Sequence, residues 1–225
     1  MSRQSCSTRV AIAAGIVTCA LIAGPALAAQ PAFAATSANL LKNPGAEQGT
    51  GSNDGGVVPV SGWVETNGAS FTEVQYGATG GFPTTSSPGP ADRGHTFFAG
   101  GPDDPNDSIV ATQILKLKPY LTAIRGGGVR FAAQAYLGGV GSDNDQALVE
   151  IDFLDKNGFF VGSSTTLPAV TAADRGNVTG LLQRSAGGKV PKAARSVSVQ
   201  LIFDRVDGTY NYGLADSLSL TLKNI

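Results

Sequence analysis

Four segments of the chain alternate with a period of two, so that every second residue is apolar: 129–137, 147–153, 197–203 and 218–222. Successive side chains of a β-strand point to opposite faces, so each segment presents one apolar face to a core and leaves the other face free. No helical pattern longer than two turns competes with this alternation. The sequence therefore predicts an all-β chain in which two sheets face each other.

Further strand candidates are less regular and occupy 63–64, 71–76, 96–99, 109–117 and 160–165. Turn-forming residues separate them, and Asn157-Gly158 between two apolar runs is a strong hairpin signal. Short helices are expected at 119–124 and after the possible cap at 171–174, and the Gly-, Pro- and Ser-rich segment 77–90 is expected to form a long exposed loop. Many short strands in one chain indicate a β-sandwich or a barrel.

The N-terminus has the layout of a secretory signal peptide. Residues 1–9 carry Arg3 and Arg9, residues 10–23 are uncharged and apolar, and small residues allow cleavage after Ala28 or after Ala34. A membrane-spanning helix, the alternative, needs about 20 apolar residues, and this run is shorter. We therefore expect residues 1–34 to be removed, leaving one β-sandwich domain over 35–225. This domain is expected to be secreted and extracellular and not to associate with a membrane. The Ala-rich signal suggests a bacterial protein.

Composition narrows the classes of partner. Both cysteines, Cys6 and Cys19, lie in the signal, so the mature protein has no disulfide and no cysteine metal site. The chain has 16 basic and 17 acidic residues, and without Arg3 and Arg9 the balance is 14 against 17. No basic run is present, so nucleic acid is not expected as a partner.

Motifs at both ends of the mature chain resemble a known family. Asn39 to Glu47 reads NLLKNPGAE, Ser61-Gly62-Trp63 follows, and Ala215 to Leu220 reads ADSLSL near the end of the chain. This combination resembles the galactose-binding-like jelly rolls, which include many secreted carbohydrate-binding modules. The resemblance implies a jelly-roll β-sandwich of two antiparallel sheets with neighbouring first and last strands.

The same resemblance implies a structural Ca²⁺ held by Glu47 and Asp216, since Ca²⁺ takes six to eight hard oxygen ligands. In the alternative, Glu47 caps a turn and Asp216 accepts loop hydrogen bonds. Segments such as Phe97 to Pro102 and Tyr210 to Gly213 resemble a secreted bacterial subgroup in which an acidic residue is expected at the position of Tyr212. A ligand contributed there is missing from this chain.

A catalytic centre is not supported by the residues. His95 is the only histidine, no G-x-S-x-G turn accompanies it, and we expect it in a loop or at a strand edge. Two further acidic clusters, 103–107 and 143–145, are expected to be solvated turns, because Asp and Asn hydrogen-bond their own backbone.

Sugar binding relies on exposed aromatic faces assisted by polar side chains. Tyr136 lies on the outward side of its segment beside Arg130 and Gln134, and with the turn residues Tyr210 and Tyr212 it forms the expected ligand-binding platform. Trp63 is expected in the core, because Trp buries a large area. Only 7% of the residues are aromatic, which is low for a dedicated polysaccharide binder.

Three functions remain open at this point. The leading interpretation is a secreted, non-catalytic module that binds a carbohydrate or cell-envelope polymer and holds structural calcium. The second is a structural or interaction protein of the cell surface or matrix without a sugar site. The third is a small hydrolase. The sequence leaves the ligand and the oligomeric state undetermined.

Overall fold

The computed structural model of the protein describes residues 35–66, 70–102 and 108–225. The expected signal peptide and the acidic cluster at 103–107 lie outside these residues. The strands are β1 (Val64–Glu65), β2 (Thr72–Gln75), β3 (Thr96–Gly101), β4 (Ser108–Lys116), β5 (Arg130–Gly139), β6 (Gln146–Leu154), β7 (Thr165–Leu167), β8 (Gly180–Lys189), β9 (Ser196–Asp204) and β10 (Asn211–Lys223). A 3-10 turn, Lys118–Tyr120, leads into the short helix α1, Leu121–Gly126, between β4 and β5.

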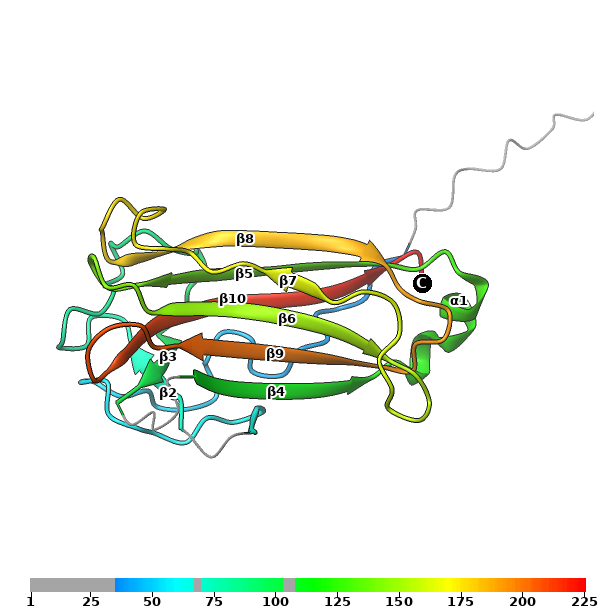
Figure 1. The fold of residues 1–225 in the computed structure, drawn as a ribbon, viewed down its shortest axis with the longest axis horizontal. Helices are drawn as coiled ribbons and strands as arrows, with labels where there is room; N and C mark the ends of the chain where they lie inside the picture. The colour runs from blue at the N-terminus through cyan, green and yellow to red at the C-terminus, as the bar shows by residue number, and fades with distance from the viewer. Residues whose placement is uncertain (1–34, 67–69, 103–107) are drawn as a thin grey trace, which may run out of the picture. The chain divides into compact units, whose positions relative to one another are not determined.

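The strands form two five-stranded antiparallel sheets, and the expected all-β fold is confirmed (Figure 1). The β10 sheet has the order β2-β3-β10-β5-β8, and the β9 sheet has the order β1-β4-β9-β6-β7. From β3 to β6 the chain changes sheet at every step, and it does so again from β7 to β10. This interleaving is that of a jelly roll, the architecture that the sequence resemblance implies.

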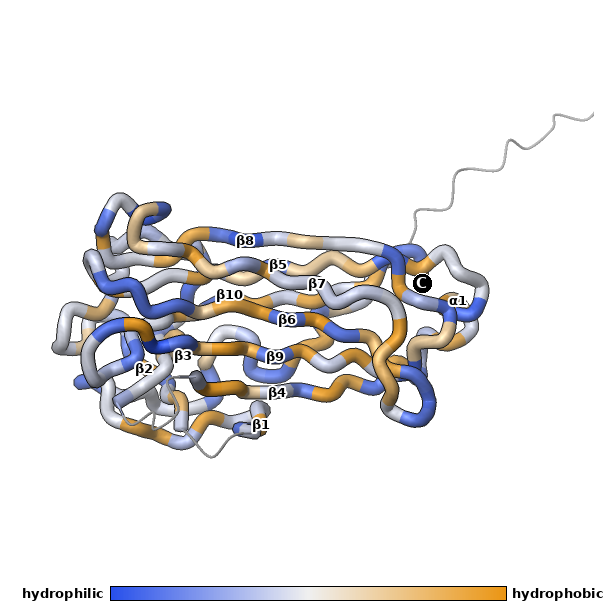
Figure 2. The backbone as a smooth tube through the Cα atoms, in the orientation of Figure 1, coloured by the Kyte–Doolittle hydropathy of each residue, from blue (hydrophilic) through white to orange (hydrophobic). Residues whose placement is uncertain are grey.

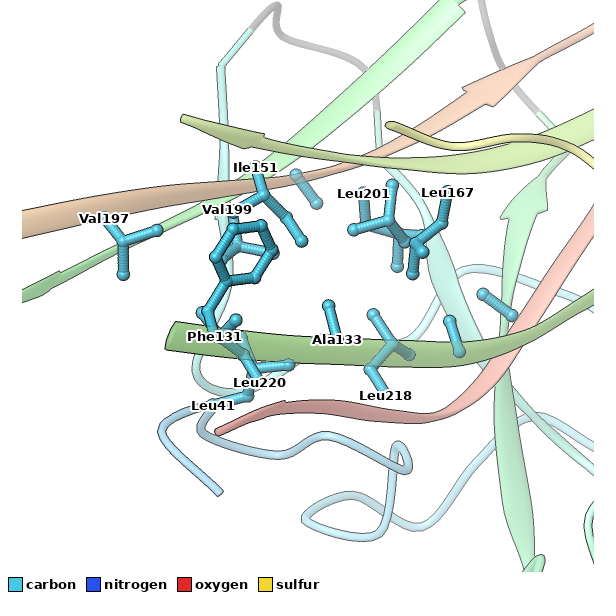
Figure 3. Close-up of a cluster of buried hydrophobic side chains, with 14 of the residues drawn as sticks. Leu41, Phe131, Ala133, Ile151, Leu167, Val197, Val199, Leu201, Leu218 and Leu220 are labelled. Carbon is cyan, nitrogen blue, oxygen red and sulfur yellow. The ribbon is translucent and has the colours of Figure 1, made fainter. Parts of the chain in front are cut away.

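The core lies between the sheets and is built from the alternating segments. Figure 3 shows two facing layers, with Phe131, Ala133, Leu218 and Leu220 on one side and Ile151, Val199 and Leu201 on the other. Trp63 is buried, 7% exposed, and packs edge-on against Phe98 with ring centroids 6.0 Å apart. Figure 2 shows the same alternation as apolar patches interrupted by polar residues along the central strands.

The two ends of the described chain lie side by side, as the jelly-roll resemblance implies. The backbone N–H groups of Ser37 and Leu40 donate to the carbonyls of Leu222 and Leu220 at 2.8 and 2.9 Å. Further along, the Leu218 N–H donates to the Pro44 carbonyl at 2.8 Å. The segment around NLLKNPGAE thus continues the β10 sheet where β3 has ended, and it brings Glu47 to the outer side of that sheet.

Most predicted strands and helices are confirmed, but one strand was missed and two predictions are wrong. β8 was missed because the residues that point inward from it show no apolar alternation: they are Leu182, Arg184, Ala186 and Gly188. The strand tolerates a polar or small residue at these positions because it lies at the edge of its sheet, where less surface is buried. The strand expected at 160–165 begins only at Thr165, since the Asn157-Gly158 hairpin extends to the bridge between Leu154 and Phe160. The short helix expected from the cap at 171–174 is absent, and residues 172–177 form turns instead. None of the helices in the described residues is long and apolar enough to cross a membrane.

Candidate functional site

Loop 77–94 folds back over part of the outer face of the β10 sheet. Its Phe82 is 5% exposed and packs with Phe97 of β3, with ring centroids 6.0 Å apart. Val74, Ala99, Leu181 and Leu214 complete this second apolar cluster, which is separate from the core between the sheets. The expected long exposed loop at 77–90 is confirmed for most of its residues but is wrong in its middle for Phe82 and Pro83, which are buried because the outward residues of these strands are apolar and need cover.

The Arg93 side chain and one backbone hydrogen bond fix this loop. The Arg93 guanidinium donates to the carbonyls of Thr84, Ser87 and Pro90 at 2.9–3.0 Å and lies over the ring of Tyr76. At the edge of the sheet, the Leu181 N–H of β8 donates to the Pro88 carbonyl at 2.9 Å. These contacts hold the loop as a wall above the sheet.

Beside this wall, the outer face remains open and forms a hollow of about 550 Å³, which we call the Tyr136 hollow. Its lining is rich in hydroxyl and amide groups around one aromatic ring. It includes Asn39, Asn43, Glu47, Gln48, Asp92, Gln134, Tyr136, Gln183, Ser217 and Ser219. The Gln183 amide donates to Gln134 Oε1 at 3.1 Å across β5 and β8. The hollow thus offers an aromatic surface surrounded by groups that can donate and accept hydrogen bonds.

The strand register explains why these side chains share one face. On β5, Phe131, Ala133, Ala135 and Leu137 point into the core, so the residues between them point outward. Paired outward residues form rows across β10, β5 and β8: Asp216–Tyr136–Gln183, Ser219–Gln134–Ser185, Thr221–Ala132–Gly187 and Lys223–Arg130–Lys189. A bulge between Asp216 and Ser219, with Ser217 at φ 50°, restores the outward direction of Ser219.

An acidic corner lies at the loop end of the hollow and consists of Glu47, Glu73 and Asp216. Glu47 Oε1 accepts hydrogen bonds from the backbone N–H groups of His95 and Thr96, both at 2.9 Å. Asp216 is fully buried, and its Oδ2 accepts the Tyr76 hydroxyl at 2.6 Å. Glu73 is also fully buried; its Oε1 accepts the Asn43 amide at 2.8 Å, whereas its Oε2 has no hydrogen-bond partner.

Burial and mutual repulsion perturb these carboxyl groups. Burial raises the pKa of Asp216 to about 7; the charge of Glu47 acts in the same direction, and the hydrogen bonds from Tyr76 and Ser217 oppose it. Burial also raises the pKa of Glu73, again with a contribution from Glu47, while the Asn43 hydrogen bond lowers it. The three carboxyl groups of the acidic corner lie close together where water solvates them poorly, so ionisation of Asp216 and Glu73 is disfavoured.

The fit of a metal ion can be judged from these contacts. Glu47 and Asp216 both engage in the hydrogen bonds that the sequence offers as the alternative to calcium. No group of three or more acidic or histidine side chains within the described ranges is arranged to hold a metal ion. The donor set is nevertheless of the oxygen type that Ca²⁺ prefers, and the orphaned Glu73 Oε2 is a buried oxygen without a compensating donor.

The structure divides the expected tyrosine platform between two places. Tyr136 and Gln134 line the hollow, and Arg130 lies on the same face at the far end of β5. Tyr210 and Tyr212 instead pack on each other and on Phe82, with ring centroids 4.6–5.6 Å apart, and the Tyr210 hydroxyl donates to the Gly55 carbonyl at 2.9 Å. Tyr210 and Tyr212 thus support the second apolar cluster.

Sequence reasoning missed several residues of the hollow. Gln183 was not singled out because β8 was not expected, and Asp92 and the Asn39 and Asn43 side chains reach the site through loops whose course no periodicity shows. The partner of each strand supplies the missing signal: once β8 pairs with β5, Gln183 must stand beside Tyr136.

The structure also shows the surroundings of His95 and of the acidic cluster at 143–145. His95 is exposed and directly precedes β3, as expected for a strand-edge residue. In the 143–145 cluster, the expectation of solvated side chains is wrong for Asp145, which is 1% exposed. Its carboxylate accepts the backbone N–H groups of Val206, Asp207 and Tyr212 at 2.6–2.9 Å and so ties two loops together.

No protein-family model matches this sequence, and no curated protein matches it. Among solved structures, the fold is similar to that of a family 16 carbohydrate-binding module, with a TM-score of 0.47, 18% identity and coverage of 81% of this chain and 99% of that chain. A family 61 carbohydrate-binding module in complex with beta-1,4-galactotriose gives a TM-score of 0.46 at 15% identity, covering 82% of this chain and 98% of that chain. The enzymatically active domain of tailspike protein 4 of bacteriophage CBA120 gives a TM-score of 0.46 at 15% identity over 81% of this chain; the match spans 21% of the tailspike chain. At these identities no residue role passes from those proteins to this chain.

Proposed function

We propose that this chain is a secreted, non-catalytic module that binds a carbohydrate or cell-envelope polymer in the Tyr136 hollow. The observation that carries the proposal is the lining itself: one tyrosine ring on a sheet face, flanked by the amides of Gln134 and Gln183 and by the hydroxyl of Ser219. An aromatic face can stack on the apolar side of a sugar ring, while amides and hydroxyls exchange hydrogen bonds with its hydroxyl groups.

The surroundings favour binding over catalysis. Of the three carboxylates that line the hollow or flank Tyr136, Glu47 is held by backbone N–H groups and Asp216 by Tyr76, which leaves only Asp92. A hydrolase would need two carboxylates free to face each other across the bound sugar, one of them as an acid and the other as a base or nucleophile. The hydrogen bonds that tie loop 77–94 to itself and to β8 agree with a preformed binding surface.

The test is isothermal titration of the protein against a panel of neutral and acidic polysaccharides. The Tyr136→Ala variant is expected to lose about tenfold or more in affinity, as for an aromatic residue at the centre of an interface. Phe159→Ala serves as the matched control, because Phe159 is 71% exposed at the β6–β7 hairpin, on a different part of the surface. Absence of binding to every polysaccharide, or equal losses in both variants, would contradict the proposal.

We further propose that Glu47 and Asp216, with loop carbonyl groups, hold a structural Ca²⁺. Support comes from the oxygen-only donors of the acidic corner and from the unpartnered Glu73 Oε2. A bound cation would offset the burial and the smaller repulsion by Glu47 that together raise the pKa of Asp216. Calcium is expected to raise the melting temperature above its value in chelator, because a ligand that binds only the folded state stabilises it. Identical melting temperatures would remove calcium from the proposal.

A further inference from the structure

The outer face of the β10 sheet continues beyond the Tyr136 hollow toward the opposite end of the sandwich. There the last row of paired residues consists of Lys223 on β10, Arg130 on β5 and Lys189 on β8. We call these three residues the basic row. All three are exposed, and none of them forms an ion pair with another described residue.

The geometry of the sheet places the basic row within reach of a polymer bound at Tyr136. Neighbouring strands lie about 4.8 Å apart, so the three cationic residues stand within about 10 Å of one another across the sheet. Arg130 and Tyr136 are separated by six positions of one strand, which corresponds to roughly 20 Å. An extended oligosaccharide can therefore contact both places at once.

Between Tyr136 and the basic row, the side chains project little from the outer face of the β10 sheet. The intervening rows carry Ser219, Gln134 and Ser185, followed by Thr221, Ala132 and Gly187. Apart from Gln134, these side chains are short, so a chain lying along β5 meets no projecting obstacle. The basic row is the first place beyond Gln134 where long side chains rise again from the sheet.

Charge is distributed unequally along this track. The loop end carries the carboxylates of Asp92 and Glu47 in the lining of the hollow, whereas the far end carries the basic row. A ligand with a negative charge on every unit would be attracted at one end and repelled at the other. A ligand that carries acidic groups on some units and neutral units elsewhere suits both ends.

We propose that the bound polymer is an acidic polysaccharide, with a carboxylate-bearing sugar at the basic row and a neutral sugar at Tyr136. This inference rests on the proposed function and specifies its ligand. Arg130 presents a planar guanidinium that can pair with a carboxylate through two hydrogen bonds, and the two lysines add charge on either side. A phosphodiester chain, including nucleic acid, is disfavoured because it is charged at each unit.

The experiment compares each polysaccharide with its carboxyl-reduced derivative, in which every uronic acid has become a neutral sugar. Hyaluronan, gellan and xanthan provide different neutral sugars next to the acidic one, and a thymidine homopolymer represents a phosphodiester chain. At low ionic strength, at least one native polysaccharide is expected to bind about tenfold more tightly than its reduced form, since three exposed ion pairs contribute a few-fold each. The ratio should approach one in 1 M salt, where the Debye length is about 3 Å.

A triple variant, Arg130→Gln with Lys189→Gln and Lys223→Gln, should abolish the difference in affinity between the native and the carboxyl-reduced polymer. The control variant changes three exposed lysines elsewhere, Lys116, Lys118 and Lys156, to Gln and lowers the net charge equally. It should preserve the preference for the native polymer.

Equal affinity for native and reduced forms of all three polysaccharides would overturn the inference but leave the proposed function intact. Tighter binding of the thymidine homopolymer than of any polysaccharide would also overturn it. If no polysaccharide binds in either form, the proposed function falls as well, so the two failures are distinguishable.

Discussion

Asp216 should make this protein less stable as the pH rises, and replacing it with asparagine should remove that dependence. The side chain is fully buried, and its pKa is raised from 3.8 to about 7. Asparagine has nearly the same shape and can still accept the Tyr76 hydroxyl, but it cannot ionise. The amide loses one acceptor, which lowers stability equally at every pH, so the slope with pH is the quantity to compare.

The sign follows from proton binding. With a raised pKa, the folded state holds a proton that the unfolded chain has already released, so the free energy of unfolding falls as the pH rises through this range. A shift of about three pKa units at about 1.4 kcal/mol each gives up to about 4 kcal/mol, of which roughly 2–3 kcal/mol should be lost between pH 5 and pH 8. Asp143 and Glu73, whose pKa values are also raised, affect both proteins alike and cancel in the comparison.

The assay is urea denaturation of wild type and Asp216→Asn in chelator from pH 5 to pH 8, followed by the fluorescence of the buried Trp63. The stability of the variant relative to wild type should increase by roughly 2–3 kcal/mol over this range. A constant difference between the two proteins would refute the reasoning. Repeating the series with calcium separates the two proposed roles, because an Asp216 that binds Ca²⁺ stays ionised and the wild type should then keep its stability at pH 8.

Two further substitutions test how the site is supported. Asp145→Ala removes the acceptor of three backbone N–H groups in a buried position and should lower the free energy of unfolding by about 2–4 kcal/mol in urea denaturation; a loss below about 1 kcal/mol would show that water replaces the carboxylate. Gly138→Ala places a methyl group 2.0 Å from the Gly180 carbonyl oxygen and should separate β5 from β8, with a loss of about 3 kcal/mol or more and weaker polysaccharide binding. Gly126→Ala, which meets nothing within 4 Å, is its control, and equal melting temperatures of the two variants would contradict the steric argument.

The basic row and the hollow could be predicted only in part from the sequence. Alternation identifies which residues of β5 point outward, and it correctly places Tyr136, Gln134 and Arg130 on one face. It says nothing about which strands lie on either side of β5. Gln183 and Lys189 therefore become part of the face only when β8 pairs with β5, and Ser219 and Lys223 only when β10 does.

For Tyr210 and Tyr212, the sequence predicted an exposure to ligand that the structure does not show. The sequence predicts them as turn residues of an exposed platform, yet Tyr212 lies on β10 and Phe82 of a distant loop packs against both tyrosines. Whether an aromatic side chain is available to a ligand depends on what covers it. Loop 77–94 decides this here, and its Gly- and Pro-rich sequence gives no periodic signal.

The period of two and the density of turn residues determined by themselves that the chain is all-β, because each strand must bury one face whichever partner it finds. The motifs at the two ends indicated a jelly roll with adjacent ends and gave Glu47 and Asp216 as neighbours of the same surface. Only the tertiary structure decided the pairing of β8, the burial of Glu73 and Asp145, and the separation of acidic and basic ends along one sheet face. These features arise from contacts between residues far apart in sequence, and such contacts are set by packing and strand register, which local patterns do not encode.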